Sequence, residues 1–121
     1  MKKRLILLLT IFLTVIIVMI CSAILQIPRG TIRVNNNTEF ALRDLRLVDF
    51  YGEVLLSQEK LLPNEYIEYK MERECSVEMT FLDHASNEQT FMIAGYAYPQ
   101  MKGLNLQITF KNGNYSFRNL Q

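Results

Sequence analysis

The sequence has few of the residues on which enzyme sites and metal centres depend. It contains no tryptophan, one histidine and two cysteines among 121 residues. A structural zinc site takes about four Cys or His ligands, and a calcium loop needs a dense run of carboxylates that is also missing. The five glycines are scattered, so no glycine-rich loop that could cradle a phosphate occurs. We therefore expect no cofactor and no metal, and we do not expect an enzyme.

The one histidine, His84, stands between Asp83 and Ser86, which invites comparison with a Ser-His-Asp triad. Such a triad is assembled from separate elements around an oxyanion hole. Residues 83–87 instead form one short polar segment that is typical of a turn. We interpret His84 as a solvated turn residue.

Positive charge is also sparse beyond the N-terminus. Three of the 13 Lys and Arg precede residue 5, which leaves 10 against 12 Asp and Glu, a net charge of −2. The arginines alternate with acids, as in residues 43–46 (Arg-Asp-Leu-Arg). Without a basic stripe, nucleic acid is not an expected partner.

The N-terminal region, by contrast, is strongly apolar. Residues 5–25 carry no charge and follow directly on Lys2, Lys3 and Arg4. At about 1.5 Å per residue they would form a helix roughly 31 Å long, enough to cross a bilayer. The basic cluster favours the cytoplasmic side. We predict a cytoplasmic cluster at 1–4, a transmembrane anchor at 5–25, a linker at 26–30 and an extracytoplasmic domain at 31–121, with the anchor in the inner (cytoplasmic) membrane and the domain periplasmic or extracellular.

A cleaved signal peptide is the alternative to a retained anchor. The apolar core of a signal peptide spans roughly 7 to 15 residues, and the run here is longer, which favours retention. Cys21, Ser22 and Ala23 nevertheless resemble a cut site after Ala23. If the anchor is retained, Cys21 cannot reach Cys75, and we interpret Cys75 as a small buried side chain or as one half of an intermolecular bridge.

From residue 31 onward the hydrophobic pattern is that of β-strands. The clearest strand is residues 76–82, where Val77, Met79 and Phe81 share one face with a period of two. Asn-Gly at 112–113 lies between two alternating runs, 104–110 and 115–120, which predicts a hairpin. Further strands are expected at 31–34, 42–50, 53–57, 66–71 and 88–94.

Seven to eight short strands predict an all-β fold, an antiparallel immunoglobulin-like β-sandwich preceded by one N-terminal transmembrane helix. The side chains expected to form its core are Ile32, Val34, Leu45, Leu47, Ile67, Tyr69, Val77, Met79, Phe81, Leu106 and Ile108.

Five segments of the sequence together carry a resemblance. These segments are residues 32–38, 42–47, 62–65, 77–83 and 103–108. In this order they are similar to a diffuse group of small bacterial proteins that have one N-terminal span and an extracytoplasmic immunoglobulin-like domain. The resemblance implies a fold and a location, and it carries over no functional residues.

The strongest candidate for a binding site is aromatic. Tyr96 and Tyr98 interrupt the strand pattern beside Gly95 and Pro99 and are followed by Met101 and Lys102. Tyrosine provides a large contact area at low entropic cost together with a hydroxyl group. One of the two could instead be a corner residue that bonds to the backbone. The candidate partner-binding residues are Tyr96, Tyr98, Met101 and Lys102.

The glutamates between residues 65 and 78 form a second candidate region. We interpret them as the solvated face of an edge hairpin.

Two functions are consistent with this sequence. The first is a membrane-anchored extracytoplasmic module that binds a protein partner, one specific form being an immunity or inhibitor protein against an envelope-acting toxin. The alternative is a structural or assembly subunit of a membrane-envelope complex. No small-molecule substrate is indicated.

Overall fold

The computed structural model of the chain describes residues 2–25 and 27–120. One helix is followed by eight strands. Their bounds are α1 (Lys2–Leu25), β1 (Thr31–Asn36), β2 (Leu42–Val48), β3 (Val54–Leu61), β4 (Tyr66–Lys70), β5 (Cys75–Leu82), β6 (Glu88–Ala97), β7 (Leu104–Lys111) and β8 (Asn114–Asn119).

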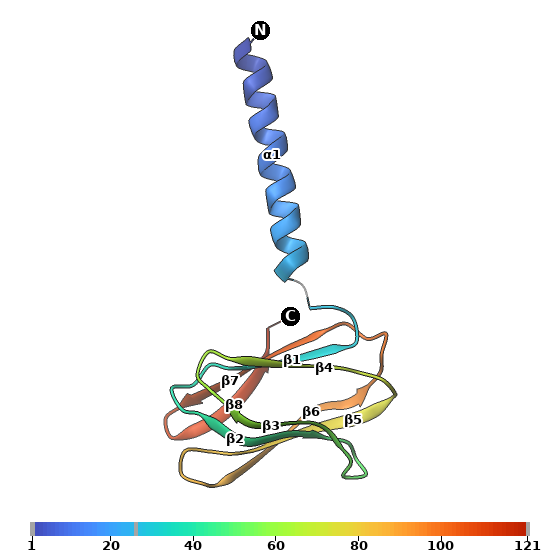
Figure 1. Cartoon of the computed structure of the whole chain (residues 1–121), viewed down its shortest axis with the longest axis vertical. Helices are drawn as coiled ribbons and strands as arrows, with labels where there is room; N and C mark the ends of the chain where they lie inside the picture. Colours follow the sequence, from blue (N-terminus) through green and yellow to red (C-terminus); the bar gives the residue numbers. More distant parts are fainter. Residues whose placement is uncertain (1, 26, 121) are drawn as a thin grey trace.

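Helix α1 extends away from the strands (Figure 1). Within it, Lys2–Cys21 is long and apolar enough to cross a membrane, and none of this stretch is buried against the rest of the chain. A helix that is apolar on all sides must be covered by another apolar phase. The predicted N-terminal apolar helix is therefore confirmed, with the length and composition of a membrane span or a signal anchor.

The strands form two four-stranded sheets that face one another (Figure 1). The strand order is β4-β1-β7-β8 in one sheet and β3-β2-β5-β6 in the other. The expected two-layer β domain is confirmed, but one pairing differs from the prediction. Strands β1 and β7 are parallel, with Ile32 opposite Leu104 and Asn36 opposite Ile108.

The parallel pair arises because β1 and β7 begin at the same end of the domain. There the Gly30 amide donates a hydrogen bond to the Met101 carbonyl at 2.8 Å, which joins the segments that lead into the two strands. The alternation of side chains along a strand carries no information about direction. The expectation of wholly antiparallel sheets is therefore wrong at this pair.

The predicted acidic edge hairpin is also wrong. Strand β4 pairs with β1 and strand β5 pairs with β2, so the chain crosses between the sheets at residues 71–74. Glu68 lies on one sheet and Glu78 on the other. The glutamates between residues 65 and 78 do not form one face.

The core lies between the sheets and follows the predicted period of two. Nine of the eleven side chains predicted to be inside are fully buried, and Ile67 and Tyr69 are half-buried against them. Phe81 is the largest buried side chain. The hairpin at 112–113 is confirmed as well, because Asn112 and Gly113 both have positive φ (53° and 79°) and Lys111 pairs with Asn114.

The connections gather at two ends of the domain. The linker end contains residues 27–30 together with the loops 49–53, 71–74 and 98–103, and the far end contains the loops 37–41, 62–65, 83–87 and 112–113. At the linker end the chain that follows α1 is tightly packed. A Cβ on Gly103 would lie 2.7 Å from the carbonyl oxygens of Ile27 and Pro28, and one on Gly30 would lie 2.1 Å from the Pro99 oxygen.

Candidate binding site at the linker end

The loop 49–53, between β2 and β3, is organised by one buried aspartate. Asp49 is 3% exposed, and its Oδ1 accepts hydrogen bonds from the amides of Tyr51 (2.9 Å) and Glu53 (2.8 Å). The backbone closes the same loop, because the Asp49 amide donates to the Glu53 carbonyl and the Gly52 amide donates to the Asp49 carbonyl, both at 3.0 Å. Gly52 takes the positive φ of 81° that this turn requires. The loop therefore has a defined conformation.

The same loop occurs at the far end of the domain. Asp83 Oδ1 accepts from the amides of Ala85 and Asn87, both at 2.9 Å, and Ser86 takes the positive φ of 62°. In both loops an aspartate precedes the residue of positive φ by three positions. Side chains of Asp that bond to backbone amides two residues on are a common turn device, so the loop conformation is encoded locally.

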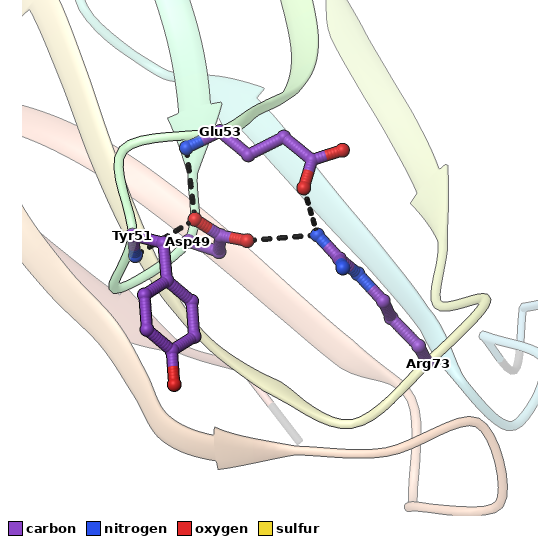
Figure 2. Close-up of polar contacts among 4 residues, drawn as sticks. All are labelled: Asp49, Tyr51, Glu53 and Arg73. Carbon is purple, nitrogen blue, oxygen red and sulfur yellow. Dashed lines mark hydrogen bonds and ion pairs between the residues drawn. The ribbon is translucent and has the colours of Figure 1, made fainter.

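Arg73 connects the loop 49–53 to the loop 71–74. Figure 2 shows its guanidinium between the carboxylates of Asp49 and Glu53. The distance from Nη2 to Asp49 Oδ2 is 2.8 Å. The hydrogen bond to Glu53 raises the pKa of Arg73 above its already high ordinary value. The guanidinium stays charged and fixes the two loops side by side.

The loop 49–53 presents two aromatic side chains to solvent. Phe50 is 79% exposed and Tyr51 90% exposed, and their rings meet edge to face at 5.7 Å. Tyr96 and Tyr98 form a second exposed pair, with ring centroids also 5.7 Å apart. We call these four residues the aromatic rim.

A hollow of about 350 Å³ lies beside the aromatic rim. Its lining residues come from the loop 49–53, the loop 71–74, the start of β5 and strand β6. They are Asp49, Phe50, Tyr51, Arg73, Glu74, Cys75, Ser76 and Gly95. Tyr96 adjoins it, since it follows Gly95 and its hydroxyl bonds to Glu74. This hydrogen bond to the carboxylate raises the pKa of Tyr96, so the phenol stays neutral and a donor.

Two side chains in the hollow have chemistry that the fold does not use. Ser76 Oγ is buried and has no hydrogen-bond partner among residues 2–25 and 27–120. Such buried polar atoms are uncommon in folded proteins. Cys75 is a free, half-buried thiol, and burial raises its pKa. It therefore behaves as a neutral, apolar part of the wall.

The structure separates the four residues proposed from the sequence. Tyr96 and Tyr98 belong to the aromatic rim, whereas Met101 is only 8% exposed and packs into the core. The loop 98–103 turns inward because its backbone binds the chain that follows α1. The Met101 side chain is thus not available to a partner, and Lys102, although exposed, does not line the hollow.

Sequence reasoning missed Phe50 and Tyr51 as site residues. Phe50 falls at the end of the strand expected at 42–50, whereas the structure ends that strand at Val48. Two adjacent aromatic residues inside an Asp-x-x-Gly turn were the available signal. Their proximity to Ser76 and Gly95 depends on the pairing of β2 with β5 and of β5 with β6.

The far end shows no catalytic geometry around His84. Its ring stacks on Phe40 at 4.0 Å and its Nδ1 lies 2.8 Å from the Tyr115 hydroxyl, while Asp83 is engaged in its own loop. His84 is exposed as predicted, but it packs on an aromatic cluster. Across residues 2–25 and 27–120, no group of three or more His, Cys, Asp or Glu could hold a metal ion.

Comparisons with known proteins support the fold alone. No family model matches the chain, and no curated protein matches it. A structure described as "NMR structure of the protein from Eubacterium rectale" is similar, with a TM-score of 0.58 and 17% sequence identity over 76% of this chain and 88% of its own. At that identity the likeness concerns the arrangement of the strands.

Proposed function

We propose that this protein is a membrane-anchored, extracytoplasmic module, an immunoglobulin-like sandwich that binds a protein partner with its linker end. The observation that carries the proposal is the aromatic rim. Its four side chains are 38% to 90% exposed, and two of them, Phe50 and Tyr51, line a hollow beside the loop that Asp49 and Arg73 hold. Clustered exposed aromatic side chains mark interaction surfaces more often than they serve stability.

The rigidity of the loop 49–53 supports a binding role. Asp49 holds Phe50 and Tyr51 in place through the amides of Tyr51 and Glu53. A loop whose backbone is already ordered loses less entropy when a partner covers it, which increases affinity. A flexible loop with the same residues would bind more weakly.

Within the anchor, by contrast, two polar side chains, those of Thr10 and Thr14, bond to the backbone of their own helix. The hydroxyls of Thr10 and Thr14 donate to the carbonyls of Ile6 and Thr10, both at 2.8 Å. They offer little to a neighbouring helix in a membrane. We therefore assign partner recognition to the β domain rather than to α1.

Site-specific photo-crosslinking tests this assignment on the full-length protein in its native membrane. A photoreactive phenylalanine analogue replaces Tyr51, Tyr96 or, as a matched control, Tyr66. Tyr66 is 55% exposed but lies on strand β4, where it contacts Arg33. We expect adducts with one protein from positions 51 and 96 and none from position 66. Adducts from position 66 alone would move the binding surface to the other sheet.

The location of the domain has its own test. The anchor follows a basic cluster, so we expect a C-terminal alkaline phosphatase fusion to be active. Mass spectrometry of the mature protein is expected to find residues 2–25 retained. A mature protein that begins at Ile24 would show that the apolar segment is a cleaved signal peptide.

A further inference from the structure

The hollow at the linker end carries a net negative charge. Asp49 and Glu74 line it together with Arg73, and Arg73 bonds to Asp49 and also to Glu53, which lies next to the lining. The carboxylate of Glu74 lies beside the neutral Tyr96 hydroxyl. Two acids against one base leave one net negative charge in the lining, and Glu53 adds a second next to it.

Carboxylates next to aromatic faces attract cations. The negative face of an aromatic ring adds roughly 0.5 to 2 kcal/mol to the attraction, depending on how well water is excluded. Phe50 and Tyr51 project from the loop, so their rings are open to a ligand. The combination fits an ammonium or guanidinium group.

This protein already combines a cation with an aromatic ring and a carboxylate at another place in the fold. On the outer face of the first sheet, the Arg33 guanidinium lies 4.6 Å from the centroid of the Tyr66 ring. The same guanidinium bonds to the Glu68 carboxylate. At the linker end aromatic rings and a carboxylate also line one hollow, and the cation in that lining, Arg73, is bonded to Asp49 and Glu53.

The hollow also contains groups that can form hydrogen bonds with a ligand. Ser76 Oγ is buried without a partner among the described residues and belongs to the lining, as does the exposed Gly95. A Cβ on Gly95 would meet nothing within 4 Å, so another chain can approach its backbone closely. These features suit a peptide segment, which brings its own amide and carbonyl groups.

We propose that the hollow binds the side chain of a lysine or arginine in an exposed segment of a protein partner, with Phe50 and Tyr51 beside its aliphatic stem and with Glu74, and Glu53 next to the lining, attracting its positive charge. This inference rests on the proposed function. A bilayer surface fits the site less well, since anionic headgroups are repelled by the carboxylates.

A titration with short peptides tests the inference. The full-length, isotope-labelled protein in uncharged detergent micelles is followed by NMR. The probes are acetylated and amidated pentapeptides Ala-Ala-X-Ala-Ala, in which X is Arg, Lys or Gln. We expect the Arg and Lys peptides to shift the amide signals of Tyr51, Ser76 and Gly95, with dissociation constants at least tenfold below that of the Gln peptide.

Two double variants isolate the local charge. Glu53→Gln with Glu74→Gln removes two charges at the hollow, and the preference for Arg and Lys over Gln is expected to fall below threefold. Glu59→Gln with Glu88→Gln removes two exposed charges on β3 and β6, outside the hollow, and is expected to leave the preference unchanged. Equal losses in both variants would reduce the effect to net charge and overturn the inference.

The remaining outcomes are equally decisive. Equal affinity for all three peptides, or signal shifts away from Tyr51, Ser76 and Gly95, would overturn the inference. If the Glu53 and Glu74 double variant still crosslinks its protein partner through position 51, the proposed function survives and only the cation preference fails. If position 51 crosslinks to lipid instead of protein, both proposals fail and the surface belongs to the membrane.

Discussion

Replacing Asp49 with alanine should unfold the loop 49–53 locally and destabilise the whole domain. The change removes the acceptor for the amides of Tyr51 and Glu53 and one of the two carboxylates on Arg73. The other side chains of the loop are unchanged in this variant. The effect therefore measures how far this one carboxylate organises the linker end.

The magnitude follows from the partners. A hydrogen bond to a charged group contributes about 1.5 to 3 kcal/mol. The loop lies at the surface and its freed amides can bind water, so the lower figure applies to each of the two, about 3 kcal/mol together. The ion pair adds less than about 1 kcal/mol, because Arg73 is half exposed and keeps Glu53. A loss of about 3 kcal/mol is a large share of the 5 to 15 kcal/mol typical of a small domain.

Denaturant unfolding of the full-length protein in detergent micelles, followed by tyrosine fluorescence, measures the free energy. Arg73→Gln is the matched control, since it removes the ion pairs and keeps the loop hydrogen bonds, and it should cost less than Asp49→Ala because the Asp49 carboxylate keeps its two amide donors. Hydrogen exchange at the amides of Tyr51 and Glu53 should accelerate only in Asp49→Ala. Equal destabilisation by the two variants would refute the reasoning and assign the stability to the ion pair.

Three further outcomes are expected. Gly103→Ala should cost about 1 to 3 kcal/mol of stability, because its Cβ would strike the backbone of the preceding linker. Gly95→Ala should change the stability by no more than about 0.5 kcal/mol, because nothing lies near it. Thermal unfolding compares the two variants, and equal effects would contradict the close packing at Gly103. Burial by itself raises the pKa of Asp83, but hydrogen bonds, chiefly from Gln89, leave that pKa below its ordinary value. The carboxylate therefore stabilises the fold at pH values above its pKa in the unfolded chain, and this contribution is lost as the pH falls through its pKa in the folded protein. The acid limb of a profile of stability against pH should flatten in Asp83→Asn, and an unchanged limb would be evidence against this role of Asp83. Phe81→Ala should cost about 3 to 5 kcal/mol in denaturant unfolding, since the ring is fully buried, and an unchanged midpoint would be incompatible with its place in the core.

Much of the fold could be predicted because its signals are local. The alternation along residues 76–82 identifies the buried face of β5 without reference to any other strand. The Asn-Gly pair at 112–113 defines its turn through the backbone preferences of those two residues. The same is true of helix α1, most of whose length is the charge-free apolar run at residues 5–25.

The pairing of the strands was harder to predict from the sequence. Nothing in the residues of β1 and β7 indicates that they run parallel, because a hydrophobic face looks the same in either direction. Nor does the sequence between β4 and β5 show that the chain changes sheets there. These choices depend on contacts between segments some 70 residues apart, such as that of Asn35 with Asn105.

The candidate site was predicted in part. Tyr96 and Tyr98 could be identified because two tyrosines beside Gly and Pro interrupt a strand pattern. Met101 could not be distinguished from them, since an apolar residue in a loop is exposed or buried according to what packs over it. Here the backbone of the linker draws its loop inward.

By itself, the sequence determined an apolar N-terminal helix, a β domain of about eight strands and the inner faces of those strands, because each of these depends on residues that are neighbours in the chain. It also encoded the two aspartate-centred loops through local side-chain to backbone bonds. Only the tertiary structure decided that Arg73 reaches Asp49 and that Tyr51, Ser76 and Gly95 line one hollow. The physical reason is that strand register and sheet order, which bring loops together, are fixed by the packing of the whole core.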